Sequence, residues 1–154
     1  MSLNLTKGQN FNIKEVAPAL LLLALGLGWD TGTKAIDLDA SAMPYGEDGK
    51  VIENEVCYFG RLNTLSGAIT HSGDNTTGAG DGDDEVITVD LAKIPANIKG
   101  IALVVNSYSG ENFGQVKNAF IRAFDKTTGT ELGKYDLTED QSGNYSLELG
   151  RIYN

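Results

Sequence analysis

The sequence predicts an all-β protein, a β-sandwich of two mainly antiparallel sheets joined by short loops or single helical turns. The chain has 154 residues with 19 glycines, and its short apolar runs alternate with turn signals such as GEDG, KTTG and QSGN. No stretch shows a sustained helical period, which also favours strands. A chain of this length is most simply one domain covering residues 1–154.

Ten runs rich in β-branched and aromatic residues are bounded by turn residues and predict strands. In chain order they are Phe11–Ile13, Ala19–Leu27, Ile36–Met43, Glu55–Phe59, Ala68–Thr70, Val86–Asp90, Ile101–Ser107, Ala119–Asp125, Glu131–Asp136 and Tyr145–Leu149. Between two of them, DLAKIPANI at 90–98 predicts at most one helical turn, because Pro95 would interrupt a longer helix.

The apolar run APALLLLALGLG, residues 17–28, is the part of the chain most open to another interpretation. Its twelve residues fall short of the ~20 that a membrane helix needs. A signal-peptide core is the more serious rival because Lys7 and Lys14 precede the run, but Glu15 interrupts the basic region and no small-x-small cleavage site follows. Pro18 and the two glycines near the end of the run favour a buried strand. We therefore expect a cytoplasmic protein.

Cys57 is the single cysteine, so the chain cannot form an intramolecular disulfide. A lone cysteine fits a reducing compartment. We expect Cys57 to be a buried, inert thiol.

The negative charge of the chain is concentrated in a few segments. Its formal net charge is −9, from 21 acids and 12 Lys and Arg residues. Eight of the acids fall in three short segments; they are Asp30, Asp37, Asp39, Asp74, Asp81, Asp83, Asp84 and Glu85. The acidity therefore indicates a site rather than a general surface property. The chain has no basic stripe that could neutralise phosphates, which argues against direct binding of nucleic acid.

The segment AIDLDASA, residues 35–42, predicts a strand that carries two carboxylates on one face. Successive side chains of a strand point to opposite faces, so Ile36 and Leu38 would face the core while Asp37 and Asp39 project together from the other side. GLGWD at 26–30 supplies a third carboxylate at the end of the preceding strand, and we expect its tryptophan to close the end of the sandwich.

The acidic segment GDNTTGAGDGDDE, residues 73–85, predicts a site for a hard cation. Two like charges ~4 Å apart repel by about 4 kcal/mol near a protein surface, so such a cluster is costly without compensation. Calcium takes about six to eight oxygen ligands, and the glycines of the segment could turn backbone carbonyls inward. Together with the acids of the two strands, the segment offers too many carboxylates for one ion and enough for two. A solvated acidic loop is the alternative.

Other motifs fit poorly. The acidic segment is not an EF-hand loop, because Ala79 stands where that loop requires glycine, and its flanks predict strands. GLGWDTG is not a dinucleotide-binding fingerprint, because Thr31 replaces the third glycine. His71 is the only histidine, and we interpret it as a structural residue beside the site rather than as a catalytic base. No nucleophile–histidine pairing is evident, so we expect a protein that is not an enzyme.

Five motifs follow one another along the chain: GLGWD, DLDAS, HSGDNTTGAGDGDDE, NFGQVKNAFIR and YDLTED. Their order, together with the start SLNLTKGQN, resembles the TerD family of tellurium-resistance and stress-response proteins. The resemblance runs from about Ser2 to Asp140. It implies a β-sandwich that binds two calcium ions, encoded in bacterial tellurite-resistance operons and related to slime-mould proteins described as cAMP-binding. The metal ligands that it implies are Asp30, Asp37, Asp39, Asp74, Asn75, Gly78, Asp81, Asp83, Asp84 and Glu85.

The sequence departs from the family pattern in two places. NSYSGE, before NFGQV, is shorter than the charged insertion of relatives, and QSGNYSLELGRIYN follows the usual pattern only loosely. Relatives continue through another strand, so we expect this chain to lack the family's final C-terminal strand, either because the sequence is trimmed or because it is a short variant. An unpaired sheet edge would then invite a homo-oligomer or a partner.

The leading hypothesis is therefore a non-enzymatic calcium-binding protein of a bacterial tellurite-resistance and stress-response system. Its expected partners are other tellurite-resistance operon proteins, at the inner face of the inner membrane. One alternative is a calcium-dependent module that attaches to a membrane surface. Another is a domain that binds a small molecule, either a cyclic nucleotide or a tellurium oxyanion.

Overall fold

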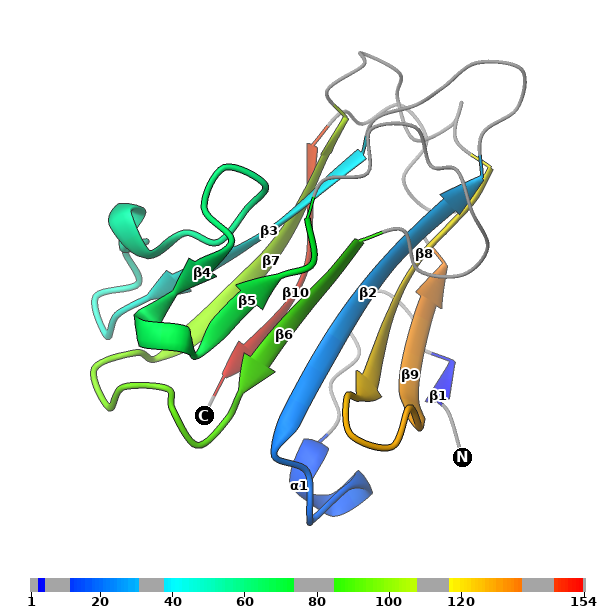
Figure 1. Cartoon of the computed structure of the whole chain (residues 1–154), viewed down its shortest axis with the longest axis horizontal. Coiled ribbons are helices and arrows are strands. Elements are labelled where there is room, and N and C mark those ends of the chain that lie inside the picture. The colour runs from blue at the N-terminus through cyan, green and yellow to red at the C-terminus, as the bar shows by residue number, and fades with distance from the viewer. Residues whose placement is uncertain are drawn as a thin grey trace.

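A computed structural model describes residues 3–4, 12–30, 38–73, 85–107, 117–136 and 146–153. These residues form two sheets and three short helices (Figure 1). The elements are β1 Leu3–Asn4, α1 Ile13–Val16, β2 Leu22–Asp30, β3 Leu38–Tyr45, η1 Glu53–Glu55, β4 Asn63–Thr64, η2 Leu65–Gly67, β5 Ile69–His71, β6 Glu85–Asp90, β7 Gly100–Ser107, β8 Lys117–Asp125, β9 Glu131–Asp136 and β10 Ser146–Tyr153. None of the short helices in the described ranges could span a bilayer.

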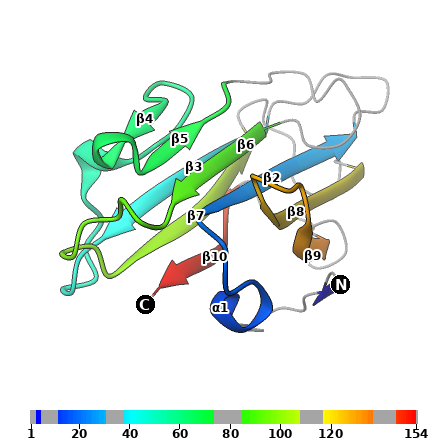
Figure 2. The same ribbon diagram turned by 60° about the horizontal axis from the view of Figure 1, so that its bottom comes forward.

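The strands form a seven-stranded sheet in the order β1-β9-β8-β2-β6-β5-β4 and a three-stranded sheet in the order β10-β7-β3. Every pair of neighbours is antiparallel except β1 and β9, which are parallel. Figure 2 shows β6 of the larger sheet beside β3 of the smaller one, and the two strands are in contact. The predicted β-sandwich with two mainly antiparallel sheets is confirmed.

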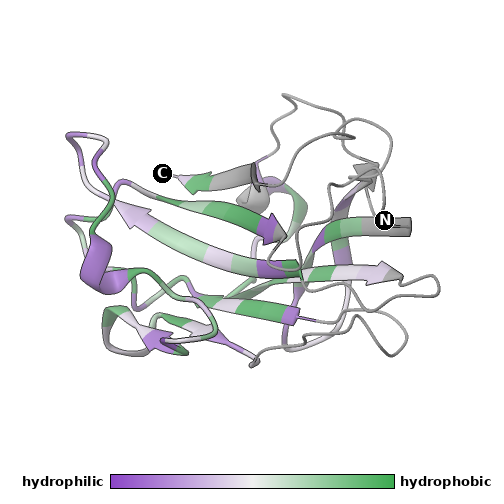
Figure 3. Cartoon of the chain, turned by 90° about the horizontal axis from the view of Figure 1, so that it is seen from above, coloured by the Kyte–Doolittle hydropathy of each residue, from purple (hydrophilic) through white to green (hydrophobic). Residues whose placement is uncertain are grey.

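β2 is a central strand of the larger sheet, with β6 on one side and β8 on the other. Leu25, Leu27 and Trp29 alternate along it and lie in the main core, with strand residues of the smaller sheet such as Leu103 and Val105 opposite them. Figure 3 shows the hydrophobic colour following the strands. The prediction of a buried strand rather than a helix for the apolar run is confirmed, although the strand begins only at Leu22.

β3 is buried on both faces, which determines the surroundings of its carboxylate. Leu38, Ala40 and Ala42 lie in the core, as the alternation predicted. Asp39 and Ser41, on the opposite face, are buried as well. A bridge to Cys57 protects the free side of the strand, since Ala42 exchanges backbone hydrogen bonds with it.

The prediction of a strand at Phe11–Ile13 was wrong for the part that the structure describes. Ile13 begins the single turn of α1, and Phe11 lies outside the described residues. The carbonyl of Asn12 accepts the backbone N–H groups of Glu15 and Val16, and this local closure favours the helical turn.

Glu55–Phe59 does not form a strand either. Glu53–Glu55 is a 3-10 turn, and after it only isolated bridges form, at Cys57 and between Tyr58 and Arg61. The tight reversal between those two residues explains this, because each donates its backbone N–H to the carbonyl of the other. The two-residue strands β1 and β4 were not predicted.

The other predicted strands exist; Glu131–Asp136 has the bounds of β9, and the others differ at one or both ends. The segment 90–98 forms two hydrogen-bonded turns rather than a helical one, with Lys93 N–H donating to Asp90 and Ile98 N–H to Pro95. β10 is longer than the predicted Tyr145–Leu149, because its pairing with β7 continues past a bulge between Glu148 and Gly150.

Candidate functional site

The elements that carry the predicted ligands meet at one end of the sandwich. β2 ends at Asp30 and β5 ends at His71, while β3 begins at Leu38 and β6 begins at Glu85. Since β6 is antiparallel to both β2 and β5, its first residue lies near the ends of those two strands. Figure 1 shows the start of β3 at the same end.

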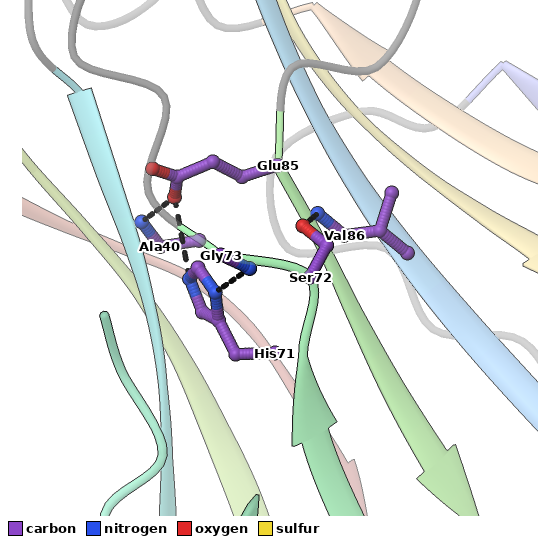
Figure 4. A network of polar contacts seen from close by, with 6 residues as sticks. All are labelled: Ala40, His71, Ser72, Gly73, Glu85 and Val86. Atoms are coloured by element: carbon purple, nitrogen blue, oxygen red, sulfur yellow. Dashed lines mark hydrogen bonds and ion pairs between the residues drawn. The ribbon is translucent and has the colours of Figure 1, made fainter. Parts of the chain in front are cut away.

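Glu85 links the two sheets at this end. Its side chain is fully buried, with 0% of the residue exposed. The backbone N–H of Ala40, on β3, donates a hydrogen bond to Glu85 Oε2 with an N···O distance of 2.9 Å (Figure 4). A buried carboxylate is costly unless it is hydrogen-bonded or paired with a cation. The first residue of β6 is therefore held against β3 of the opposite sheet by its own side chain.

His71 lies between Glu85 and the start of the acidic segment. The backbone N–H of Gly73 donates to His71 Nδ1 at 2.9 Å, and His71 Nε2 lies 3.4 Å from Glu85 Oε2 (Figure 4). A ring nitrogen that accepts a hydrogen bond carries no proton. The imidazole proton is therefore on Nε2, where it faces the carboxylate.

Ser72 makes two hydrogen bonds to Val86 across the β5–β6 connection. Its hydroxyl oxygen accepts the backbone N–H of Val86 at 2.9 Å, and its own N–H donates to the carbonyl of Val86 at 2.8 Å. This pair lies at the surface, whereas the His71 and Glu85 side chains are buried.

Asp39 is the second carboxylate buried near this end, with 2% of the residue exposed. It stands opposite Asn106 of β7 and directly precedes Ala40, whose N–H is bonded to Glu85. Both acids are withdrawn from water, and Glu85 of the larger sheet contacts the residue that follows Asp39 on β3. The strand pattern predicted the placement of Asp39, but it did not predict that the far face of β3 would be buried too.

The structure places three of the ten predicted ligands. Asp39 and Glu85 are described with their side chains, and Asp30 is placed as the last residue of β2, in register with Lys117. The other seven lie outside the described residues: Asp37, Asp74, Asn75, Gly78, Asp81, Asp83 and Asp84. Within the described ranges, no three or more His, Cys, Asp and Glu side chains form a group that could hold a metal.

Cys57 stands apart from this cluster and is completely buried. Burial raises the pKa of its thiol to about 11, an effect that the nearby hydroxyl of Thr64 and the charge of Arg61 reduce only in part. A thiol with so high a pKa is a poor nucleophile at neutral pH. The prediction that this cysteine is buried is confirmed.

Sequence reasoning missed the contacts that join these groups. The backbone N–H groups of Ala40 and Gly73 carry no sequence signal as donors. The available clue was the spacing, because His71 directly precedes the acidic segment and Glu85 closes it. Two strands joined by that segment had to bring the histidine and the glutamate together.

Comparison with known proteins defines the family. The TerD domain model matches residues 1–154. The chain belongs to the TerD family. General stress protein 16U of Bacillus subtilis (strain 168) is 40% identical to it over 162 residues, which cover 99% of this chain and 84% of that protein. Tellurium resistance protein TerD of Serratia marcescens is 38% identical over 161 residues, with the same coverage of 99% and 84%.

A solved TerD-family structure supports the fold. It is a homologue of telluride resistance protein (TerD) from Streptomyces coelicolor A3(2), and it matches with a TM-score of 0.73 at 22% identity. The match covers 88% of this chain and 82% of that one. The predicted resemblance to the TerD family of tellurium-resistance and general stress proteins is confirmed.

Proposed function

We propose that this TerD-family chain is a non-enzymatic calcium-binding protein of a bacterial tellurite-resistance and stress-response system. Two Ca²⁺ ions would be held by Asp30, Asp37, Asp39 and the acids of the acidic segment, Glu85 among them. The biological setting follows from the names of relatives, which include tellurium resistance and general stress proteins. The metal follows from the chemistry of the residues.

The observation that carries the proposal is the buried pair of acids. Asp39 and Glu85 are 2% and 0% exposed and come from different sheets, yet the hydrogen bond from Ala40 to Glu85 brings their chain positions together. Two buried carboxylates beside a segment with further acids favour a cation nearby, because like charges brought together are costly. A divalent cation would supply the positive charge.

The arrangement of His71 favours a hard cation over zinc. Zinc prefers histidine and cysteine ligands. His71 Nδ1 already accepts from Gly73, its Nε2 faces Glu85, and Cys57 is buried elsewhere with a raised pKa. The donors that remain are oxygens, which suit calcium.

The proposed role of the ion is to stabilise the folded arrangement at this end of the sandwich. Ca²⁺ would offset the repulsion among the carboxylates and fasten the acidic segment to β3, which would present one fixed surface to a partner. An ion that binds only the folded form stabilises it by RT ln(1 + [L]/Kd), roughly 2.7 kcal/mol at a hundredfold excess over Kd.

Thermal unfolding tests this proposal. The chain is stripped of metal with EDTA and then melted in EDTA, in millimolar CaCl2 and in millimolar MgCl2. We expect Ca²⁺ to raise Tm by more than Mg²⁺ does, because a site of many carboxylates and carbonyls suits the larger, more flexibly coordinated ion. The same Tm in all three solutions would overturn the proposal.

The proposal places the protein in the cytoplasm, where other tellurite-resistance operon proteins would be its partners at the inner membrane. The support for this is the set of names carried by its relatives. Co-sedimentation with anionic liposomes, with and without Ca²⁺, tests direct attachment to the membrane. Sedimentation only with Ca²⁺ would favour attachment through the ion, and no sedimentation in either condition would leave protein partners.

A further inference from the structure

A row of polar contacts joins both ends of the acidic segment to the opposite sheet. Gly73, its first residue, donates to His71 Nδ1 at 2.9 Å. His71 Nε2 lies 3.4 Å from Oε2 of Glu85, the last residue of the segment; this contact is too long or too bent for a hydrogen bond, so Nε2 is buried with the carboxylate as its nearest charged neighbour. The same Oε2 accepts from the N–H of Ala40 on β3 at 2.9 Å. Figure 4 shows the imidazole between the glycine and the carboxylate.

We propose that His71 is a positioning residue, which orients the Glu85 carboxylate and holds the two ends of the acidic segment in a fixed relation to β3. This inference rests on the proposed function insofar as the oriented group belongs to a calcium site. His71 itself would not bind the ion, because one of its nitrogens accepts from Gly73 and the other faces Glu85.

The requirement for histidine follows from its two nitrogens. A neutral imidazole has one donor and one acceptor on a rigid ring. The N–H of Gly73 occupies the acceptor, which leaves the proton on the nitrogen that faces Glu85. The backbone at the start of the acidic segment therefore determines which way the donor points. Partners of this kind commonly orient carboxylates around metals, and their loss costs about 10–100-fold in metal affinity.

The alternative is that His71 only fills space in the interior. Both its side chain and that of Glu85 are fully buried, so any substitution could reduce stability in a general way. A positioning role makes a narrower prediction, because it extends to the N–H of Ala40, which His71 does not bond. The N–H of Ala42 on the same strand donates to Cys57 and serves as an internal reference.

Two amide variants distinguish the roles of the two ring nitrogens of His71. The amide nitrogen of glutamine is as many bonds from Cα as Nε2, so His71→Gln still presents an N–H to Glu85. The side-chain oxygen of asparagine matches Nδ1, so His71→Asn can still accept from Gly73 but cannot reach the carboxylate. Ser72→Ala is the matched control, since it removes a contact at the same connection that lies outside this row of contacts.

The first measurement is amide hydrogen exchange in EDTA, which needs no bound ion. We expect His71→Asn to speed exchange at Ala40 more than at Ala42, and His71→Gln to stay close to the wild type. Equal acceleration at both amides would indicate general destabilisation and overturn the proposal. Wild-type exchange at Ala40 in His71→Asn would overturn it as well.

The second measurement is calcium titration of the same variants by calorimetry, under conditions in which each is folded. We expect about 10–100-fold weaker binding for His71→Asn, with His71→Gln and Ser72→Ala near the wild type. Equal loss in the Asn and Gln variants would contradict the donor role of Nε2. If the wild type binds no calcium, the proposed function fails, while the exchange measurement still decides whether His71 positions Glu85.

The third measurement uses the wild type alone and is independent of whether the variants fold. Nitrogen-15 NMR of the imidazole should place the proton on Nε2, with Nδ1 unprotonated, both in EDTA and in CaCl2. A proton on Nδ1 would contradict the hydrogen bond from Gly73 and with it the proposal.

Discussion

Glu85 Oε2 accepts the backbone N–H of Ala40 at 2.9 Å, although the two residues are 45 positions apart and belong to different sheets. Most sheet contacts in a sandwich are apolar, so a polar contact between the sheets at one end marks a special site. Its consequence is that the residue closing the acidic segment is also the residue that touches β3. If the segment binds an ion as proposed, binding there would be coupled to the packing of the two sheets.

Replacing Glu85 by leucine should destabilise the chain even without metal. Leucine has about the size of glutamate but no acceptor. The substitution leaves the N–H of Ala40 buried without its partner, at a cost of about 1–3 kcal/mol. Urea unfolding in EDTA measures the change, with Glu47→Leu at an exposed turn as the control. Equal stability of the two variants would show that the contact contributes nothing.

Asp39→Asn should weaken calcium binding without unfolding the protein. Asparagine keeps the shape and hydrogen-bonding capacity of the side chain and removes one buried charge. We expect a loss of at least about tenfold in affinity, or 1.4 kcal/mol, with little change of stability in EDTA. The control is Asp48→Asn, because Asp48 is exposed and accepts only a local N–H from Lys50. Equal affinity of both variants would remove Asp39 from the ligand set.

Because the pKa of the Cys57 thiol is raised, the free energy of unfolding should depend on pH in the alkaline range. Its pKa is raised from 9.0 to about 11, so between these values the folded state holds the proton that the unfolded state has lost. The free energy of unfolding should therefore fall as pH rises through this window, by up to roughly 3 kcal/mol at 1.36 kcal/mol per unit.

Other groups titrate in the same window, so the measurement is the difference between the wild type and Cys57→Ala. Urea unfolding at pH 8, 9, 10 and 11 gives that difference directly. A difference that stays constant with pH would show that the thiol is not desolvated as its burial indicates.

The turn between β4 and β5 contains backbone strain. Leu65, Ser66 and Gly67 have φ values of 50°, 54° and 94°, so three successive residues are left-handed. A side chain costs roughly 1–2 kcal/mol in that conformation. Gly67→Ala should lower the free energy of unfolding by about this amount. Gly46→Ala, where an added Cβ would make only ordinary contacts, should change it less. The reverse order would contradict the strain.

The sequence predicted the fold well where alternation was strong. In AIDLDASA it put Leu38 and Ala40 in the core and Asp39 on the opposite face, as β3 has them. The apolar run was too short for a membrane helix, and it does contain a buried strand, although β2 spans Leu22–Asp30 rather than Ala19–Leu27. Phe11–Ile13 failed because a single local hydrogen-bonded turn at Asn12 outweighed a strand pattern of three residues. A segment of three residues has too few alternating positions to outweigh a local hydrogen-bonded turn.

For the candidate site, the sequence indicated which acids to consider, and their role as ligands stays a prediction; the contacts between them could not be predicted. Charge density identified Asp39 and Glu85, and strand alternation placed Asp39 correctly. The contacts of Glu85 with Ala40 and His71 depend on how β3 and β6 face each other across the sandwich. This is a tertiary relation that no local spacing encodes.

Calorimetric titration of Ca²⁺ into the metal-free wild type is the decisive test of the proposed calcium site. We expect saturable binding that approaches two ions per chain and weakens in Asp39→Asn, Asp37→Asn and Asp83→Asn. The absence of any saturable heat at millimolar Ca²⁺, or unchanged binding in all three variants, would contradict it.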